Sequence, residues 1–188
     1  MKIKKVENKL IVNNTTSPKN KNWINPALTF LFFTGLTLTI FEINIFHLTI
    51  IDWRIPTGVW LGVGIFALIF FRKVLREYYD TKNIFLQLVF TVCSFGGLST
   101  YGFMASNYYM NASIETETLK TEIIKNGHLA KGRSGCGEPY ANVIINGAEK
   151  QLIFPCDFEI ERYRYVNIKL RRGFLGFYLI LEQVPTNQ

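Results

Sequence analysis

The chain has 188 residues, of which 48% are hydrophobic and only 19% are charged, and its mean hydropathy is +0.14. Soluble domains carry about 25% charged residues, so this composition excludes collagen-like and intrinsically disordered chains and points to membrane-embedded segments. The formal net charge of +7 would indicate nucleic-acid binding only if the charge lay on one folded basic face.

Residues 1–24 are predicted to form a basic tail. Residues 1–22 contain six lysines and one glutamate. Such a tail is typical of the cytoplasmic side of a membrane protein, where lysine and arginine accumulate beside the spans. The same charges can also contact anionic lipid headgroups.

Three charge-poor segments follow, and we interpret residues 25–110 as a three-helix transmembrane region with spans at about 26–46, 56–74 and 84–106. A spanning helix needs roughly 20 apolar residues, with about 17 as the lower limit. The third segment is the longest, and residues 84–114 contain no charged residue. A soluble protein with buried helices is the alternative, but it would need a very large core. We expect the first segment to be a retained signal anchor, because it starts late and lacks a small-residue cleavage site.

Orientation is predicted from the distribution of basic residues. Residues 72–83 contain four basic and two acidic residues, whereas residues 112–188 contain ten basic and nine acidic residues. The positive-inside rule therefore places the tail and the second loop in the cytoplasm, and the first loop and the C-terminal part outside. Because the excess charge is an orientation signal, we predict no nucleic-acid partner. The chain is therefore predicted to be a multi-pass protein of the plasma or inner membrane.

Two features of the spans are candidate sites. Glu42 is the single acid in the first segment and is a candidate intramembrane polar site, with a position at the outer interface as the alternative. Gly58 and Gly62 are four residues apart and are predicted to support close helix packing, either within one chain or between copies. Small residues with the same potential recur in the third segment, at Gly96, Gly97, Ser99 and Gly102.

Residues 111–188 are predicted to form an extracytoplasmic β domain. Asn126-Gly127 and Asn146-Gly147 are strong hairpin signals, and Arg172-Gly173 is a weaker one. The strand-like runs around these turns predict a six-stranded antiparallel barrel or sandwich. The expected strands are 119–125, 128–131, 140–145, 150–154, 166–171 and 174–181.

A disulfide bond between Cys136 and Cys156 is predicted. Both cysteines lie in the part placed outside the cell, where disulfides persist. The bond would close a loop of about 20 residues and would contribute about 3 kcal/mol in the chain-entropy account. Cys93 lies in the third span and is expected to be an inert apolar residue.

Catalytic and metal-binding constellations are not recognisable in the sequence. His47 and His128 have no neighbours at ligand spacing, and Ser134 lacks the strand–turn–helix context of a nucleophile elbow. The acidic residues 157, 159 and 161 before Arg162 form either a ligand patch or, more simply, a solvated connection. We therefore predict no metal, no cofactor and no enzyme activity.

These observations lead to a functional expectation. The chain is expected to be a non-catalytic interaction or assembly module of the cell envelope, with the bilayer and an envelope protein as partners. The alternative is an oligomeric pore or transporter subunit, in which copies pack through the glycine faces with Glu42 toward the lumen. An enzyme within the β domain is the third and weakest reading.

Overall fold

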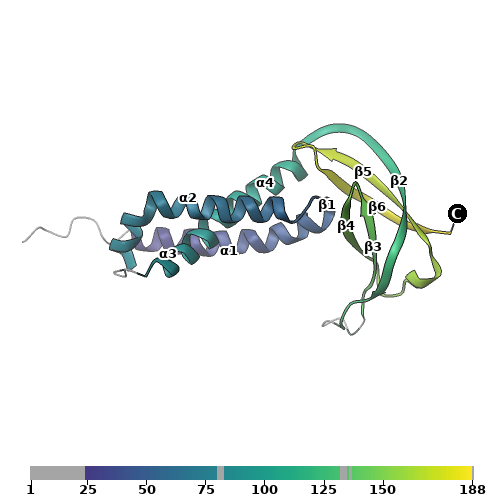
Figure 1. Cartoon of the computed structure of the whole chain (residues 1–188), viewed down its shortest axis with the longest axis horizontal. Coiled ribbons are helices and arrows are strands. Elements are labelled where there is room, and N and C mark those ends of the chain that lie inside the picture. Colours follow the sequence, from purple (N-terminus) through teal and green to yellow (C-terminus); the bar gives the residue numbers. More distant parts are fainter. Residues whose placement is uncertain (1–23, 80–82, 132–134, 136, 188) are drawn as a thin grey trace, which may run out of the picture.

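The computed structural model describes residues 24–79, 83–131, 135 and 137–187. A group of helices occupies one end of the molecule and a curved β-sheet occupies the other (Figure 1). The predicted tail, residues 1–24, lies outside the described residues except for Ile24, which begins the first helix.

Within the described residues, three helical segments are long and apolar enough to cross a membrane, as predicted from length and composition. The first two are α1 (Ile24–Leu48) and α2 (Arg54–Tyr79). The third consists of α3 (Ile84–Thr91), the π-helical turn η1 (Val92–Gly96) and α4 (Gly97–Tyr109). The apolar segments are longer than the predicted spans, at Pro26–Leu48, Arg54–Glu77 and Ile84–Tyr109.

Side chains of the loops cap two of these helices. The Asn83 side-chain oxygen accepts a hydrogen bond from the Phe85 backbone N–H at 3.0 Å, so Asn83 is the N-cap of the third span. The second helix begins earlier than Pro56, at Arg54, because the Asp52 carboxylate accepts a hydrogen bond from the Arg54 N–H at 2.9 Å. An acid at a helix N-terminus also interacts favourably with the helix dipole.

The β domain is a six-stranded antiparallel sheet that curls into a nearly closed barrel, with strand order β1-β6-β5-β2-β3-β4. Beyond the two residues of β1, the Gln183 side-chain N–H of β6 donates to the Ile153 carbonyl of β4 at 2.5 Å, across the opening of the barrel. The strands are β1 (Thr49–Ile50), β2 (Asn111–His128), β3 (Pro139–Ile145), β4 (Ala148–Ile153), β5 (Tyr165–Gly173) and β6 (Tyr178–Thr186).

One predicted hairpin is wrong and another is confirmed. The chain does not turn at Asn126-Gly127, because β2 continues to His128 and pairs there with β3. Residues 128–131 are therefore not a separate strand. At Asn146-Gly147 the backbone does turn, with φ values of 52° and 81°, as a tight two-residue hairpin requires. Both glycines follow an asparagine, so the dipeptide alone could not separate the two cases.

The predicted number of strands is confirmed, but their identities differ. The strand expected over 174–181 begins at Tyr178, because residues 174–177 form a turn in which Gly176 has a φ of +89°. The sixth strand is β1, which lies in the loop between α1 and α2 and pairs with Leu179 and Tyr178 of β6. This loop was expected to be only a connection between two spans.

Candidate functional site

Residues 49–51, directly after α1, form the centre of the junction between the helices and the barrel. Because successive side chains of a strand point to opposite sides, Ile50 and Ile51 enter different cores. Ile50 packs in the barrel core with Val143, Ile168 and their neighbours. Ile51 packs with Ile45 of α1 and Met104 of α4. Two adjacent residues, Ile50 and Ile51, therefore belong to the two different apolar cores.

Lys150 of β4 provides a polar attachment to α1. Its ammonium group donates to the carbonyl oxygens of Phe46 at 2.6 Å and Thr49 at 2.8 Å. It also lies 4.7 Å from the centroid of the Phe46 ring. These carbonyls lie at the end of the helix, where backbone acceptors lack helical partners and a positive charge is favourable. The residue is only 7% exposed, and its burial lowers the pKa of Lys150 to about 8.

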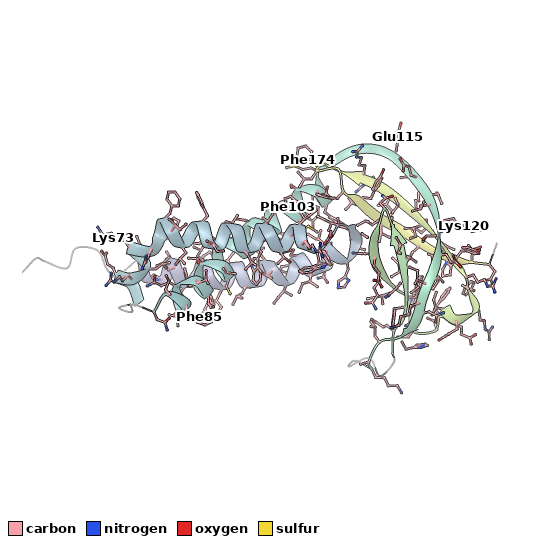
Figure 2. The ribbon with its side chains drawn as sticks, viewed as in Figure 1. Lys73, Phe85, Phe103, Glu115, Lys120 and Phe174 are labelled. Carbon is pink, nitrogen blue, oxygen red and sulfur yellow. The ribbon has the colours of Figure 1, made fainter. Side chains whose placement is uncertain are left out.

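Asn107 of α4 provides a second polar attachment. It is fully buried, accepts a hydrogen bond from the Leu175 N–H at 3.0 Å and donates one to the Phe177 carbonyl at 3.3 Å. The rings of Phe103 and Phe177 are in contact beside it, with centroids 6.0 Å apart. Figure 2 shows Phe103 and Phe174 at this end of the helices, whereas Lys73 and Phe85 lie at the opposite end. The turn between β5 and β6 is thus held on α4.

Gly173 makes the contact with Asn107 possible. A Cβ atom at this glycine would lie 2.3 Å from the Asn107 carbonyl oxygen and 2.6 Å from its side-chain nitrogen. Such distances are far below van der Waals contact, so a larger residue would push the turn away from α4. The glycine predicted as part of a turn signal therefore has a packing role as well.

A cleft of about 230 Å³ lies between α1 and α2, and Glu42 lines it. Glu42 is half-buried, and no basic side chain among the described residues forms an ion pair with it. Aromatic side chains form much of the surrounding wall, together with Pro56 and Thr57 of α2. These aromatic residues are Phe46, Trp53 and Trp60.

A larger groove of about 640 Å³ continues from this cleft toward the barrel. Phe46 and Trp53 line both spaces, so the two adjoin. Polar and apolar side chains both line the groove, and they include acidic and basic residues. Its charged residues are Asp52, Arg54, Glu149 and Lys150, with His47 beside them.

Gly58 and Gly62 face open space within the described part of the chain, since a Cβ atom at either position would meet nothing within 4 Å. The close helix contacts form at other glycines. A Cβ at Gly35 of α1 would lie 2.3 Å from the Cys93 carbonyl oxygen, and one at Gly64 of α2 would lie 2.6 Å from Val92. Gly96 and Gly97 of the third span have similarly close neighbours on the other two helices.

The predicted disulfide stays a prediction. Cys156 lies in the turn after β4, but Cys136 lies outside the described residues. Cys93 is a free thiol in the third span. Ser134 also lies outside the described residues.

The histidines and acidic residues predicted to carry no metal are spread over the molecule. Within the residues that the structure describes, no three His, Cys, Asp or Glu side chains come together in a way that could hold a metal ion. His128 lies 3.4 Å from Glu161, and Glu159 forms an ion pair with Arg162. Two of the three acidic residues before β5, Glu159 and Glu161, therefore lie against local basic or histidine side chains.

Sequence reasoning missed the attachments, although two carried a signal. Lys150 shares a face of β4 with Leu152, and both are buried, so the alternation already placed a lysine on the core side. Asn107 follows Thr100 and Met104 at helical spacing, and all three are buried. Ile50 gave no signal, because a strand of two residues is too short to be recognised.

Comparison of the chain with protein-family models, with characterised proteins and with solved structures finds no match. The geometry of the junction, and of the two regions that it joins, is therefore the basis for a functional proposal.

Proposed function

We propose that the chain is a non-catalytic interaction or assembly module of the cell envelope, which holds a small β barrel in a fixed position at the outer membrane–water interface. One observation carries this proposal: the loop between two apolar helices supplies both a strand and a core residue, Ile50, to the barrel. The barrel therefore cannot reorient without losing part of its own core.

The attachments at Lys150 and Asn107 support the same proposal. They lie on different helices, α1 and α4, and on different parts of the barrel. A domain held at separate points has little freedom to rotate, and a fixed orientation favours binding because less conformational entropy is lost.

The barrel surface also offers a place for a partner. Ile124 of β2 and Ile144 of β3 lie on either side of the Ile123–Val143 pair, and their side chains are 58% and 54% exposed. Glu122 and Glu149 are exposed close by. An apolar centre with a polar rim is the usual arrangement of a protein–protein interface.

Site-specific photo-crosslinking in cells tests the proposal. A photoreactive residue at Ile124 or Ile144 is expected to capture an envelope protein, whereas the same residue at the exposed Lys169 of β5 serves as the matched control. Capture of nothing at Ile124 and Ile144 would contradict the proposal. Capture of second copies of this chain alone would favour the oligomeric alternative.

Thiol labelling tests the proposed side of the membrane. After mild reduction of intact cells, a membrane-impermeant reagent is expected to label Cys156, which is exposed in the turn after β4. Labelling of Cys156 only after lysis would place the barrel in the cytoplasm. The variant Cys156→Ser distinguishes this signal from labelling of the other two cysteines.

A further inference from the structure

The cleft between α1 and α2 exists because the two helices pack against the third span rather than against each other along their length. Gly35 brings α1 onto η1, and Gly64 brings α2 onto Val92 of the same turn. The third span therefore fills one side of the pair. On the opposite side the cleft remains open, and Glu42 lines it.

The position of Glu42 gives the cleft its chemical character. Glu42 lies six residues before Leu48, the last residue of α1, which corresponds to roughly 9 Å along the helix. The carboxylate is thus close to the outer boundary of the apolar layer in the proposed orientation. Acids at this depth are costly and are usually paired. Within the described residues, no basic side chain supplies that pair.

Lys150 contacts α1 close to Glu42 in the sequence, at Phe46, but its ammonium group is already engaged. It lies over the Phe46 ring, one helical turn beyond Glu42, and donates to two backbone carbonyls. The remaining charges of the adjoining groove belong to Asp52, Arg54 and Glu149. The two positive charges of Lys150 and Arg54 are matched by the two negative charges of Asp52 and Glu149. The groove therefore has no excess of positive charge to attract a phosphate.

Aromatic rings complete a site for a cation. Phe46, Trp53 and Trp60 line the cleft with Glu42, and the faces of aromatic rings attract ammonium groups. The volume of about 230 Å³ is below the roughly 300–1,000 Å³ of pockets for drug-sized ligands, so it suits a headgroup rather than a whole ligand. Ile43 lines the same cleft, belongs to the apolar segment Pro26–Leu48 and is 52% exposed.

We propose that this cleft binds the ammonium headgroup of a membrane lipid, with the Glu42 carboxylate as the counter-charge and the rings of Trp53 and Trp60 as walls. The lipid chains would extend along the apolar outer surfaces of α1 and α2. Access from the bilayer favours a lipid over a soluble amine. This inference does not depend on the proposed interaction function, because it concerns a different surface.

Native mass spectrometry of the full-length protein tests the proposal. The protein is extracted from vesicles with equal amounts of phosphatidylethanolamine and phosphatidylglycerol, and the retained lipid is identified. The wild type is expected to retain phosphatidylethanolamine at least tenfold in preference to phosphatidylglycerol. Glu42→Gln is expected to abolish the preference, whereas Glu77→Gln, at the exposed far end of α2, is expected to preserve it.

A charge reversal keeps the test informative if Glu42→Gln extracts poorly. Glu42→Lys is expected to favour phosphatidylglycerol, because its headgroup carries no ammonium and its phosphate is negative. Equal retention of both lipids by the wild type would overturn the proposal, and so would an unchanged preference in Glu42→Gln. A dimer mass without bound lipid would also overturn it, because a second copy would then fill the cleft.

Discussion

The barrel buries its large apolar side chains in its interior, whereas the helices expose many of theirs on the outer surface. In the barrel, Val143, Val166 and Ile168 are 0% exposed, whereas Phe30, Ile69 and Phe70 on the helices are 73%, 69% and 67% exposed. The hydrophobic effect explains the barrel, since water surrounds it. It explains the helices only if lipid surrounds them, because lipid chains are as apolar as these side chains.

The interior of the helical region also differs from the interior of the barrel, because several of its buried residues carry hydroxyl groups. Its buried positions include Thr91, Ser94 and Thr100. The Ser94 hydroxyl donates to the Phe90 carbonyl at 2.6 Å, and the Thr100 hydroxyl donates to the Gly96 carbonyl at 2.8 Å. Small residues with locally satisfied hydroxyls allow helices to approach closely in a membrane. One chain therefore uses two packing rules, and the change occurs between Ile50 and Ile51.

The largest expected difference follows from truncating one isoleucine in each region. Ile168→Ala removes fully buried atoms from the barrel core and is expected to lower the free energy of unfolding by about 2–5 kcal/mol. Ile69→Ala on the outer face of α2 is expected to change it by less than about 0.5 kcal/mol. Limited proteolysis of the full-length protein in nanodiscs during heating measures both. Similar losses in the two variants would mean that Ile69 is covered by protein rather than by lipid.

The cysteines extend the comparison. The predicted bond between Cys136 and Cys156 would stabilise the barrel by about 3 kcal/mol, whereas Cys93 in the third span is a free thiol. Denatured protein is therefore expected to contain one titratable thiol among its three cysteines before reduction, and three after it. Three thiols before reduction would show that the barrel folds without the bond.

A pair of glycine substitutions tests the docking of one region on the other. Gly173→Ala places a methyl group against Asn107 and is expected to lower the free energy of unfolding by about 1–3 kcal/mol. The matched control is Gly58→Ala, whose methyl group meets nothing within 4 Å. It is expected to be neutral or to stabilise α2 by up to about 1 kcal/mol, because alanine favours helix. The Tm of Gly173→Ala is therefore expected to fall below that of the wild type, whereas the Tm of Gly58→Ala is expected to stay unchanged or to rise.

Apart from the comparison variants Ile69→Ala and Gly58→Ala, the substitution with the smallest expected effect at neutral pH is Lys150→Met, and its pH dependence tests the Lys150 attachment. Burial lowers the pKa of Lys150 from 10.5 to about 8 in the folded chain, so between these pH values the unfolded chain binds more protons. The stability of the folded state therefore rises as the pH increases from about 8 to about 10.5. Lys150→Met removes this titration. The difference in Tm between wild type and Lys150→Met is expected to shift in favour of the wild type across this interval.

A constant difference in Tm between the two proteins would contradict the burial of the Lys150 charge. At neutral pH the substitution is expected to change the free energy of unfolding by only about 1 kcal/mol, because the lost hydrogen bonds are offset by the removal of a buried charge. All other titrating groups are common to both proteins and cancel in the difference.

Periodicity and composition predicted the elements better than their contacts. The three apolar segments extend over long windows and stand out from the rest of the chain, and Asn146-Gly147 marks a real hairpin. Asn126-Gly127 has the same letters but lies inside β2, because strand pairing with β3 continues through it. The candidate acid Glu42 was recognisable because it is isolated in an apolar segment. The rings of Trp53 and Trp60 beside it were not, since Trp53 lies in the loop after α1 and Trp60 lies in α2.

Local composition and the spacing of neighbouring residues are sufficient to divide this protein into apolar helices and a nearly neutral β domain. How the two are joined depends on tertiary contacts between residues that are far apart in the sequence. Lys150 and Phe46 are 104 residues apart in the sequence. Ile50 is still farther from its strand partner Tyr178. Contacts of this kind depend on where the chain returns in space, and no local pattern of side chains specifies that return.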